Sequence, residues 1–269
     1  MAKLMQTRRT FLASMMGASA FVLSACGGSN GGGNGGSGAA PAATAPAGDG
    51  TDAKSEGVMT YAEYAAAAID EPVVIEAFVQ GKQSWWENQA TIYAADADGA
   101  YFIYNATCTE DDYAKLVEGQ KIKVNGYKAE WSGEIEITEG TIEFEDDSSY
   151  IATPVDVTDK LGTDELINFQ NQKVSFKGLT VAPSVDPNGA EVAFLYNYDG
   201  SGAQGDDLYF NVSLADKVYS FTVESYLNDK DSDVYKAVEA LKVGDTIDAE
   251  GFLYWYEGAN PHITSITVK

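Results

Sequence analysis

A phrase of glycines and apolar residues occurs twice in this chain, and its spacing constrains the fold more than any other feature. In each copy a leucine stands three residues before a glycine, and a second glycine follows seven residues later: Leu116 to Gly126, and Leu241 to Gly251. Five and seven residues after the second glycine stand an aromatic residue and a further glycine. Shared spacing of this kind indicates an internal duplication. In each copy the first glycine predicts a turn after a helix, and the alternation that follows predicts a strand closing on the second glycine.

The first copy lies within a set of predicted strands and one helix. Asp98-Gly99 is a two-residue hairpin signal between two alternating segments. A helix is expected to begin at Thr109, with Asp112 as an approximate capping box, and to run to Val117. A helical segment at 61–68 leads into the set. The expected strands are 73–79, 91–94, 100–104, the stretch closing on Gly126, and 134–137 continuing to 144.

The second copy has matching parts in the same order. A helical lead-in is expected at 164–169 and a helix at 233–241. The expected strands are 173–181, 191–198, 208–212 together with 219–223, and the segments after Gly244 and after His262.

Three strands, a helix and two more strands is the order of the OB-fold, a small five-stranded barrel. We therefore predict a mainly β chain with two tandem OB-fold-like barrels, each with a helix between its third and fourth strands. The expected boundaries are 58–148 and 149–269. Over residues 58–269 the chain resembles exported bacterial lipoproteins built of tandem OB-fold modules, a resemblance that rests on topology and the duplicated phrase. It implies the OB-fold and a lipid-anchored, exported protein; it is nearly silent on the ligand, because a fold with this many uses does not name a function.

The N-terminus predicts export and lipid attachment. Arg8 and Arg9 are the only arginines in the chain and precede a modest apolar stretch, and Leu23-Ser24-Ala25-Cys26-Gly27 reads as a lipobox. Residues 1–25 are thus expected to be a signal peptide of the twin-arginine type, with the general secretory route as the alternative. Cys26 is the expected lipid attachment site, and 26–57 a flexible tether. The protein is expected to be anchored to the outer face of the cell membrane.

Charge and composition exclude several functions. The chain has 17 basic and 41 acidic residues, a net charge of −24; removing 1–25 removes three basic residues and no acid, which gives −27. Nucleic acid is therefore an unfavourable partner. With His262 as the single histidine, histidine metal clusters and serine triads are excluded, and we expect neither a metal site nor a cofactor. Cys108 is expected to be a buried residue at a strand end. The acidic segments 96–99 and 229–233 could suggest calcium, but a hairpin turn and a helix cap explain them.

Aromatic residues in loops are the candidate ligand contacts. Ligands of OB-folds usually lie along strands two and three, between the loop joining strands one and two and the loop joining strands four and five. Such rings can either line a groove or pack the barrel ends and join the modules. The candidates are Trp85, Trp86, Tyr93 and Trp131 in the first unit, and Tyr254, Trp255 and Tyr256 in the second.

Three functions remain open on the sequence. The preferred hypothesis is a non-enzymatic surface module that binds an oligosaccharide or peptide by aromatic stacking. A single-strand nucleic-acid binder suits the fold but not the charge. A hydrolase that uses carboxylates alone is the third, although no spacing marks a catalytic pair.

Overall fold

The computed structural model describes residues 54–269, except for the side chains of Asp146 and Asp147. The predictions for Arg8, Arg9, Cys26 and the tether fall outside these residues, apart from the last few residues of the tether.

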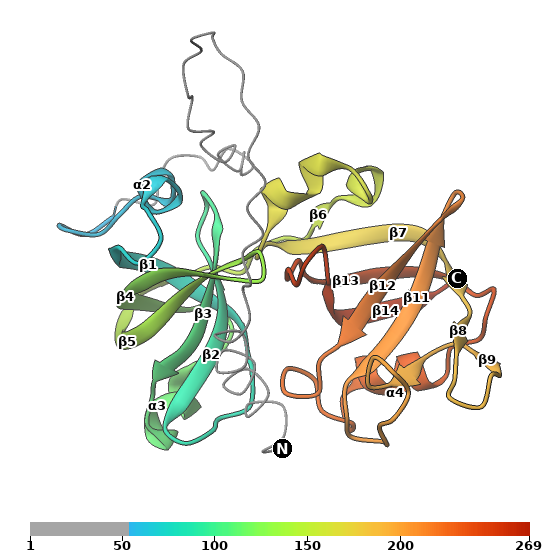
Figure 1. The fold of residues 1–269 in the computed structure, drawn as a ribbon. Coiled ribbons are helices and arrows are strands. Elements are labelled where there is room, and N and C mark those ends of the chain that lie inside the picture. Colours follow the sequence, from blue (N-terminus) through green and yellow to red (C-terminus); the bar gives the residue numbers. More distant parts are fainter. Residues whose placement is uncertain (1–53) are drawn as a thin grey trace, which may run out of the picture. The chain divides into compact units, whose positions relative to one another are not determined.

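The first barrel is a closed OB-fold. Its five strands follow the order β1-β2-β3-β5-β4 around the barrel, so the strands that are third and fifth in sequence lie side by side (Figure 1). Helix α3 (Glu110–Lys115) lies between the third and fourth strands, as predicted, and α2 (Tyr61–Ala66) leads into the barrel. The strands are β1 (Pro72–Lys82), β2 (Gln89–Ala95), β3 (Ala100–Thr107), β4 (Gln120–Trp131) and β5 (Glu134–Ser149).

The second barrel repeats this order. Its strands run β11-β12-β14-β13-β7, and β11 also pairs with β7, which closes the ring. Helix α4 (Asp233–Glu239) occupies the place of α3. Two 3₁₀-helices, η1 (Thr158–Lys160) and η2 (Asp164–Phe169), precede the barrel together with β6 (Val155–Asp156). The strands are β7 (Lys173–Ala182), β11 (Leu208–Leu214), β12 (Lys217–Val223), β13 (Thr246–Phe252) and β14 (His262–Val268).

The backbone of both barrels requires the two glycines of the duplicated phrase. Its first glycine has a positive φ, +85° at Gly119 and +93° at Gly244, which only glycine adopts without strain. Its second glycine lies where the fourth strand crosses closely over the fifth. A Cβ at Gly126 would stand 2.6 Å from Ile137 Cγ2, and one at Gly251 would stand 2.2 Å from the His262 carbonyl oxygen.

The prediction that the fourth strand closes on the second glycine is wrong for the first barrel. There β4 continues to Trp131, with a register shift between Asn125 and Tyr127. The glycine marks a bulge that bends the strand around the barrel and does not end it.

The assignment of 191–198 as the second strand of the second barrel is also wrong. The true second and third strands are β11 and β12, joined at Leu214 and Lys217 by the two-residue turn Ala215-Asp216. Residues 183–207 form one long loop instead. It carries three short strands, β8 (Ser184–Val185), β9 (Glu191–Val192) and β10 (Leu195–Tyr196), of which β8 pairs with β9 and β10 pairs with β11.

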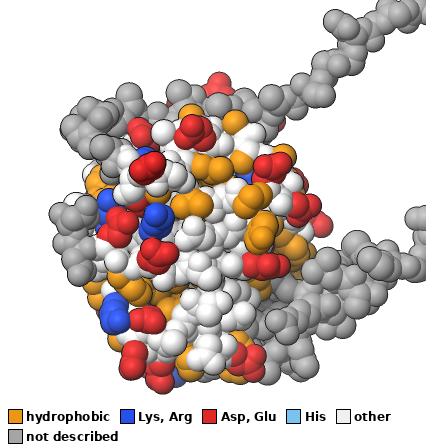
Figure 2. Space-filling view, turned by 90° about the vertical axis from the view of Figure 1, so that its left-hand side faces the viewer, with side chains coloured by type: hydrophobic (Ala, Val, Ile, Leu, Met, Phe, Trp, Pro, Cys, Tyr) orange, Lys and Arg blue, Asp and Glu red, His pale blue; other side chains and the backbone are white. Residues whose placement is uncertain are grey.

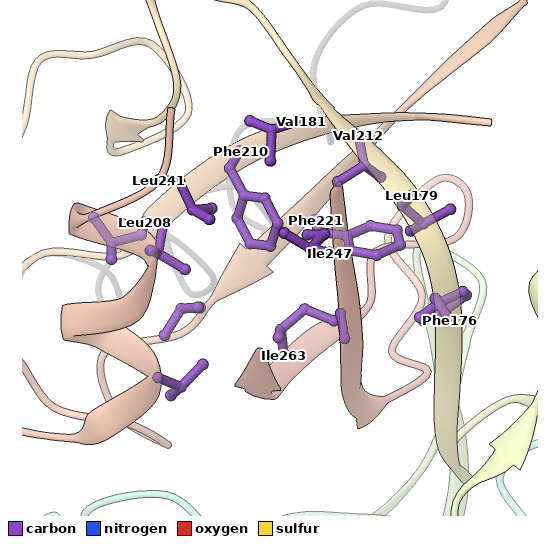
Figure 3. Close-up of a cluster of buried hydrophobic side chains, with 14 of the residues drawn as sticks. Phe176, Leu179, Val181, Leu208, Phe210, Val212, Phe221, Leu241, Ile247 and Ile263 are labelled. Atoms are coloured by element: carbon purple, nitrogen blue, oxygen red, sulfur yellow. The ribbon is translucent and has the colours of Figure 1, made fainter. Parts of the chain in front are cut away.

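Each barrel has its own apolar core, and a third cluster joins them. In the second barrel, Phe176, Phe210 and Phe221 point toward one another from β7, β11 and β12 (Figure 3). The third cluster consists of Tyr93 and Phe102 from the first barrel with Phe252 and Tyr254 from the second. The rings of Tyr93 and Phe252 stack in parallel, with centroids 4.2 Å apart. The boundary at 148/149 falls at the end of β5 and stays a prediction.

Candidate ligand-binding groove

The outer face of β2 and β3, where an OB-fold would hold its ligand, is covered in the first barrel. Tyr93 and Phe102 lie on this face and are 0% and 1% exposed. The covering residues come from the end of β13 and from the start of β14: Phe252 stacks on Tyr93, and the Tyr93 hydroxyl lies 2.9 Å from His262 Nδ1. The His262 ring stacks in turn on Tyr254, which is buried. Tyr93 and Tyr254 therefore join the two barrels and present no ligand surface.

The β1–β2 loop of the first barrel is held against the second. The amide of Ser84 donates to the Tyr226 carbonyl oxygen at 2.7 Å, and the Gln83 side chain donates to Glu224 at 2.7 Å. Beside these contacts, the indole N–H of Trp85 donates to the Cys108 carbonyl oxygen at 3.0 Å. Trp85 and Trp86 are both half-buried. Cys108 is buried just after β3, as predicted, and burial raises the pKa of its thiol.

The β4–β5 turn of the first barrel interlocks with the β13–β14 loop of the second. The amide of Glu257 donates to the Ser132 carbonyl oxygen at 2.7 Å. A Cβ at Gly133 would stand 2.8 Å from the ring of Trp255, so glycine is required for this approach. The ring of Trp131 packs against Tyr256, with centroids 5.0 Å apart. Trp131 thus meets a loop residue of the second barrel, not the groove of its own.

In the second barrel the equivalent face is open. A hollow of about 350 Å³ lies over β11 and β12, bordered by the long 183–207 loop and by the β13–β14 loop. These are the boundaries that an OB-fold groove should have. Tyr198 is 76% exposed and Tyr256 is 43% exposed, so both rings are available to a ligand. The lining consists of Ser184, Val185, Leu195, Tyr198, Tyr209, Asn211, Ser220, Tyr256, Ala259 and Asn260.

A second hollow, of about 220 Å³, adjoins the first. The two share Ser220 and Ala259, so they meet across β12 and the β13–β14 loop. Trp255 lines this smaller hollow together with Pro261, and its far wall is the lead-in segment from Leu161 to Leu166. Trp255 and Tyr256 therefore belong to neighbouring parts of one continuous groove.

Among the described residues, no charged side chain lines either hollow. The polar groups are hydroxyls and amides, and several are held in place: Asn211 Nδ2 donates to Ser184 Oγ at 3.2 Å, and Thr222 Oγ1 donates to Asn260 Oδ1 at 2.7 Å. Asp207 is buried close by, and burial raises the pKa of this carboxyl group. The groove offers aromatic faces and neutral hydrogen-bonding groups in an acidic surrounding.

The lysines of 115–128 do not form a basic strip. Lys121 is buried and lies 3.3 Å from Glu76 and 3.1 Å from Glu145, and the Lys128 ammonium group donates to three backbone carbonyl groups around α2. Lys115 pairs with Asp112. Figure 2 shows acidic side chains spread over the face of the first barrel, among hydrophobic ones and few basic ones.

The acidic loops have the structural roles that were expected. Asp96 accepts the amides of Asp98 and Gly99 in the β2–β3 turn, and its other oxygen pairs with Lys54 at 2.9 Å. Ser232 caps α4 by accepting the amide of Tyr235. Within residues 54–269, no cluster of three or more His, Cys, Asp or Glu side chains could hold a metal ion.

One buried carboxyl group lies beneath the junction of the two barrels. Glu134 is 0% exposed; its Oε2 accepts the amide of Trp255 at 2.8 Å and the side chain of Gln170 at 3.2 Å. Its Oε1 is buried without a hydrogen-bond partner, and so is Oδ1 of Asn171, whose side chain also contacts the carboxyl group. Burial, reinforced by the nearby Glu136, raises the pKa of Glu134 well above its ordinary value. In the neutral form of the carboxyl group, a proton on Oε1 would make this oxygen a hydrogen-bond donor instead of a buried acceptor without a partner.

The sequence could have indicated part of this groove. Tyr209, Asn211 and Ser220 were missed because 191–198 was taken as the second strand. The signal was the two-residue spacing Ala215-Asp216 between two alternating segments, which is typical of a tight hairpin.

Comparison with known proteins identifies no family for this chain. No protein-family model and no curated protein matches the sequence. Solved structures with a similar fold include the Ifi202 HINa domain in complex with 20-base-pair double-stranded DNA (10% identity, TM-score 0.33, covering 75% of this chain and 96% of that chain). A murine DNA-binding protein bound to double-stranded DNA is 12% identical (TM-score 0.33, 74% and 95%). A single-stranded DNA-binding protein from Thermus aquaticus is 11% identical (TM-score 0.22, 75% and 94%). Likeness this remote carries no argument about ligand. The OB-fold assignment rests on the strand order of the two barrels.

Among residues 54–269, no helix has the length and apolar character needed to span a membrane.

The buried Glu134 predicts a pH-dependent stability. In the folded state the pKa of Glu134 is raised above the ordinary 4.5. The protonated carboxyl group therefore contributes most to the free energy of unfolding below pH 4.5, and this contribution is lost as the pH rises through the folded-state pKa. Glu134→Gln keeps an acceptor for the Trp255 amide and removes the charge, so it should stabilise the protein at pH 7 by about 1–3 kcal/mol. Urea unfolding between pH 4 and pH 8 measures this. Glu130→Gln, at an exposed position of β4, is the matched control; a Glu134→Gln variant no more stable than the parent at pH 7 would contradict the interpretation.

Proposed function

We propose that this protein is an exported, lipid-anchored binding protein that holds a neutral or basic linear ligand in the groove of its second barrel. The lipid on Cys26 would anchor it to the outer face of the membrane, and the 26–57 segment would hold the barrels away from the surface. The groove face of the first barrel is covered by residues of the second barrel. The first barrel binds no ligand and supports the wall of the open groove.

The observation that supports this proposal most is the asymmetry between two copies of one fold. The face of β2 and β3 is sealed, whereas the face of β11 and β12 carries a hollow with exposed tyrosines. Exposed aromatic rings grouped around a concave surface mark binding sites more often than chance exposure does.

The alternatives from the sequence fit this groove less well. Nucleic-acid backbones require lysine or arginine at the contact surface, and among the described residues none lines either hollow. A hydrolase that relies on carboxylates needs two acids facing the substrate, and neither hollow has one in its lining. Binding without catalysis is the function that the groove supports best.

Aromatic substitutions in the groove should lower affinity without unfolding the protein. Tyr209→Ala and Tyr256→Ala should each cost about 1–3 kcal/mol of binding through lost stacking. The mature chain with Cys26→Ala, which carries no lipid, can be probed on arrays of neutral oligosaccharides, eight-residue peptides and oligonucleotides, and the affinity of the best probe then measured by calorimetry. Tyr127→Ala, at an exposed tyrosine of β4, is the control. Unchanged affinity in both groove variants, or preferred binding of oligonucleotides that weakens steeply with salt, would contradict the proposal.

Lipid attachment should depend on one residue. Cys26→Ala should abolish incorporation of labelled lipid in the bacterial cell, while Cys108→Ala, at the second cysteine of the chain, should leave it unchanged. Arg8→Lys combined with Arg9→Lys should block export if the twin-arginine route is used. Labelled lipid on the Cys26→Ala protein would contradict lipid attachment at Cys26. Normal export of the double-lysine protein would favour the general secretory route.

A further inference from the structure

One edge of β12 is unpaired along most of its length. On one side β12 pairs with β11 from Lys217 to Val223. On the other side it pairs with β14 at a single position, Thr222 with His262, where the Thr222 amide donates to the Pro261 carbonyl oxygen at 3.0 Å.

The direction of that bond shows which groups face the open edge. Backbone groups of a strand point alternately to its two sides, so Val218 and Ser220 direct their N–H and C=O groups the same way as Thr222. Within the described residues, neither Val218 nor Ser220 has a backbone hydrogen bond on this side. Val218 is 59% exposed, and Ser220 is exposed as well.

The first barrel is closed at the equivalent place. There β3 and β5 pair at Phe102, Ile103 and Thr107, so the pairing extends along the strand and the ring is sealed. The opening is therefore a property of the second barrel and not of the duplicated unit.

The smaller hollow lies along this open edge. Tyr219, Ser220 and Phe221 of β12 line one side, and Leu161 to Leu166 line the other. It continues into the larger hollow through Ser220 and Ala259, so an occupant of the edge could extend beneath Tyr209 and Tyr256.

We propose that the ligand of this groove is an extended peptide segment that adds to the open edge of β12 as a further strand. This inference rests on the proposed function and names the class of its ligand. Unpaired N–H and C=O groups in strand spacing are a template for another extended backbone. An apolar side chain of the peptide would enter the smaller hollow, and neighbouring side chains would meet the tyrosines of the larger one.

The surroundings favour a peptide over a second copy of this chain. The far wall formed by Leu161 to Leu166 faces the edge across a hollow of about 220 Å³, so a strand from a second barrel would have to fit between this wall and β12. Two mature copies would each bring a net charge of −27, which is −24 for the whole chain less the three basic residues of 1–25. Asp164 is an exposed acid of the far-wall segment, whereas Glu165 pairs with Lys160 at 2.7 Å. Together with the net negative charge of the chain, Asp164 favours a peptide with lysine or arginine beside its apolar residue.

Ser220→Pro tests the inference because it removes one edge N–H and no bond of the β11–β12 ladder. Proline is tolerated at strand edges where the N–H faces away from the sheet. The tightest-binding eight-residue peptide from the array should lose about tenfold in affinity for this variant, the equivalent of one hydrogen bond at the upper end of its usual range. Ser220→Ala keeps the N–H and removes the groove hydroxyl, so it is the reference: Ser220→Pro should bind the peptide about tenfold more weakly than Ser220→Ala, and equal affinities of the two variants would contradict the inference.

A second measurement does not depend on the folding of the proline variant. The same peptide, methylated at alternate backbone nitrogens on one edge, should fail to bind the unaltered protein, while methylation on the opposite edge should be tolerated. Peptide binding should also slow amide hydrogen exchange at Val218 and Ser220.

The outcomes separate this inference from the proposed function. Binding of neutral oligosaccharides but of no peptide, or peptide affinity that is equal for both methylated forms, would overturn strand addition and leave the groove in place. The protein could instead form a concentration-dependent dimer that Ser220→Pro abolishes and that the peptide does not displace. This result would assign the edge of β12 to a second copy and overturn the proposal of a peptide ligand. Binding of no probe on any array would contradict the proposed function itself.

Discussion

The stack of Tyr93 on Phe252 is the contact on which the arrangement of this protein depends. It lies within a cluster of four fully buried or nearly buried aromatic rings, two from each barrel, which His262 completes by contacting both Tyr93 and Tyr254. Burying an aromatic side chain of this size contributes roughly 1.5–3 kcal/mol, so the cluster binds the barrels strongly. Because these rings come from the face that an OB-fold uses for ligands, the first barrel gives up its own groove in forming the contact.

The same contact places the loops that shape the second groove. Once the barrels are packed together, the β4–β5 turn reaches the β13–β14 loop, where Glu134 holds the Trp255 amide and Trp131 packs on Tyr256. The wall of the open groove is thus supported from the neighbouring barrel. The two barrels therefore differ in their parts: the first supports the wall of the groove, and the second has an open face, the long 183–207 loop and an edge of β12 that is unpaired along most of its length.

Much of the fold could be predicted from the sequence, because hydrophobic alternation, hairpin glycines and helix caps act locally. The order of strands, the helix between the third and fourth, and the caps at Thr109 and Ser232 all follow from such signals. The groove could not be located in this way. Tyr93 and Tyr198 are both tyrosines near predicted strand ends, yet one is 0% and the other 76% exposed, because packing between barrels decides the difference. Residues 191–198 alternate like a strand, but the hairpin of β11 and β12 leaves them no place in the barrel.

Hydroxyl-radical footprinting of the ligand-free protein tests the central claim most directly, because it measures side-chain exposure without knowledge of the ligand. The structure predicts rapid oxidation of Tyr198 and Tyr256 and strong protection of Tyr93 and Tyr254. Phe252→Ala, which removes the ring stacked on Tyr93, should raise the oxidation rate of Tyr93 and leave that of Tyr198 unchanged. Oxidation of Tyr93 in the parent protein as fast as that of Tyr198 would show that the first barrel keeps an open face, and would contradict the account.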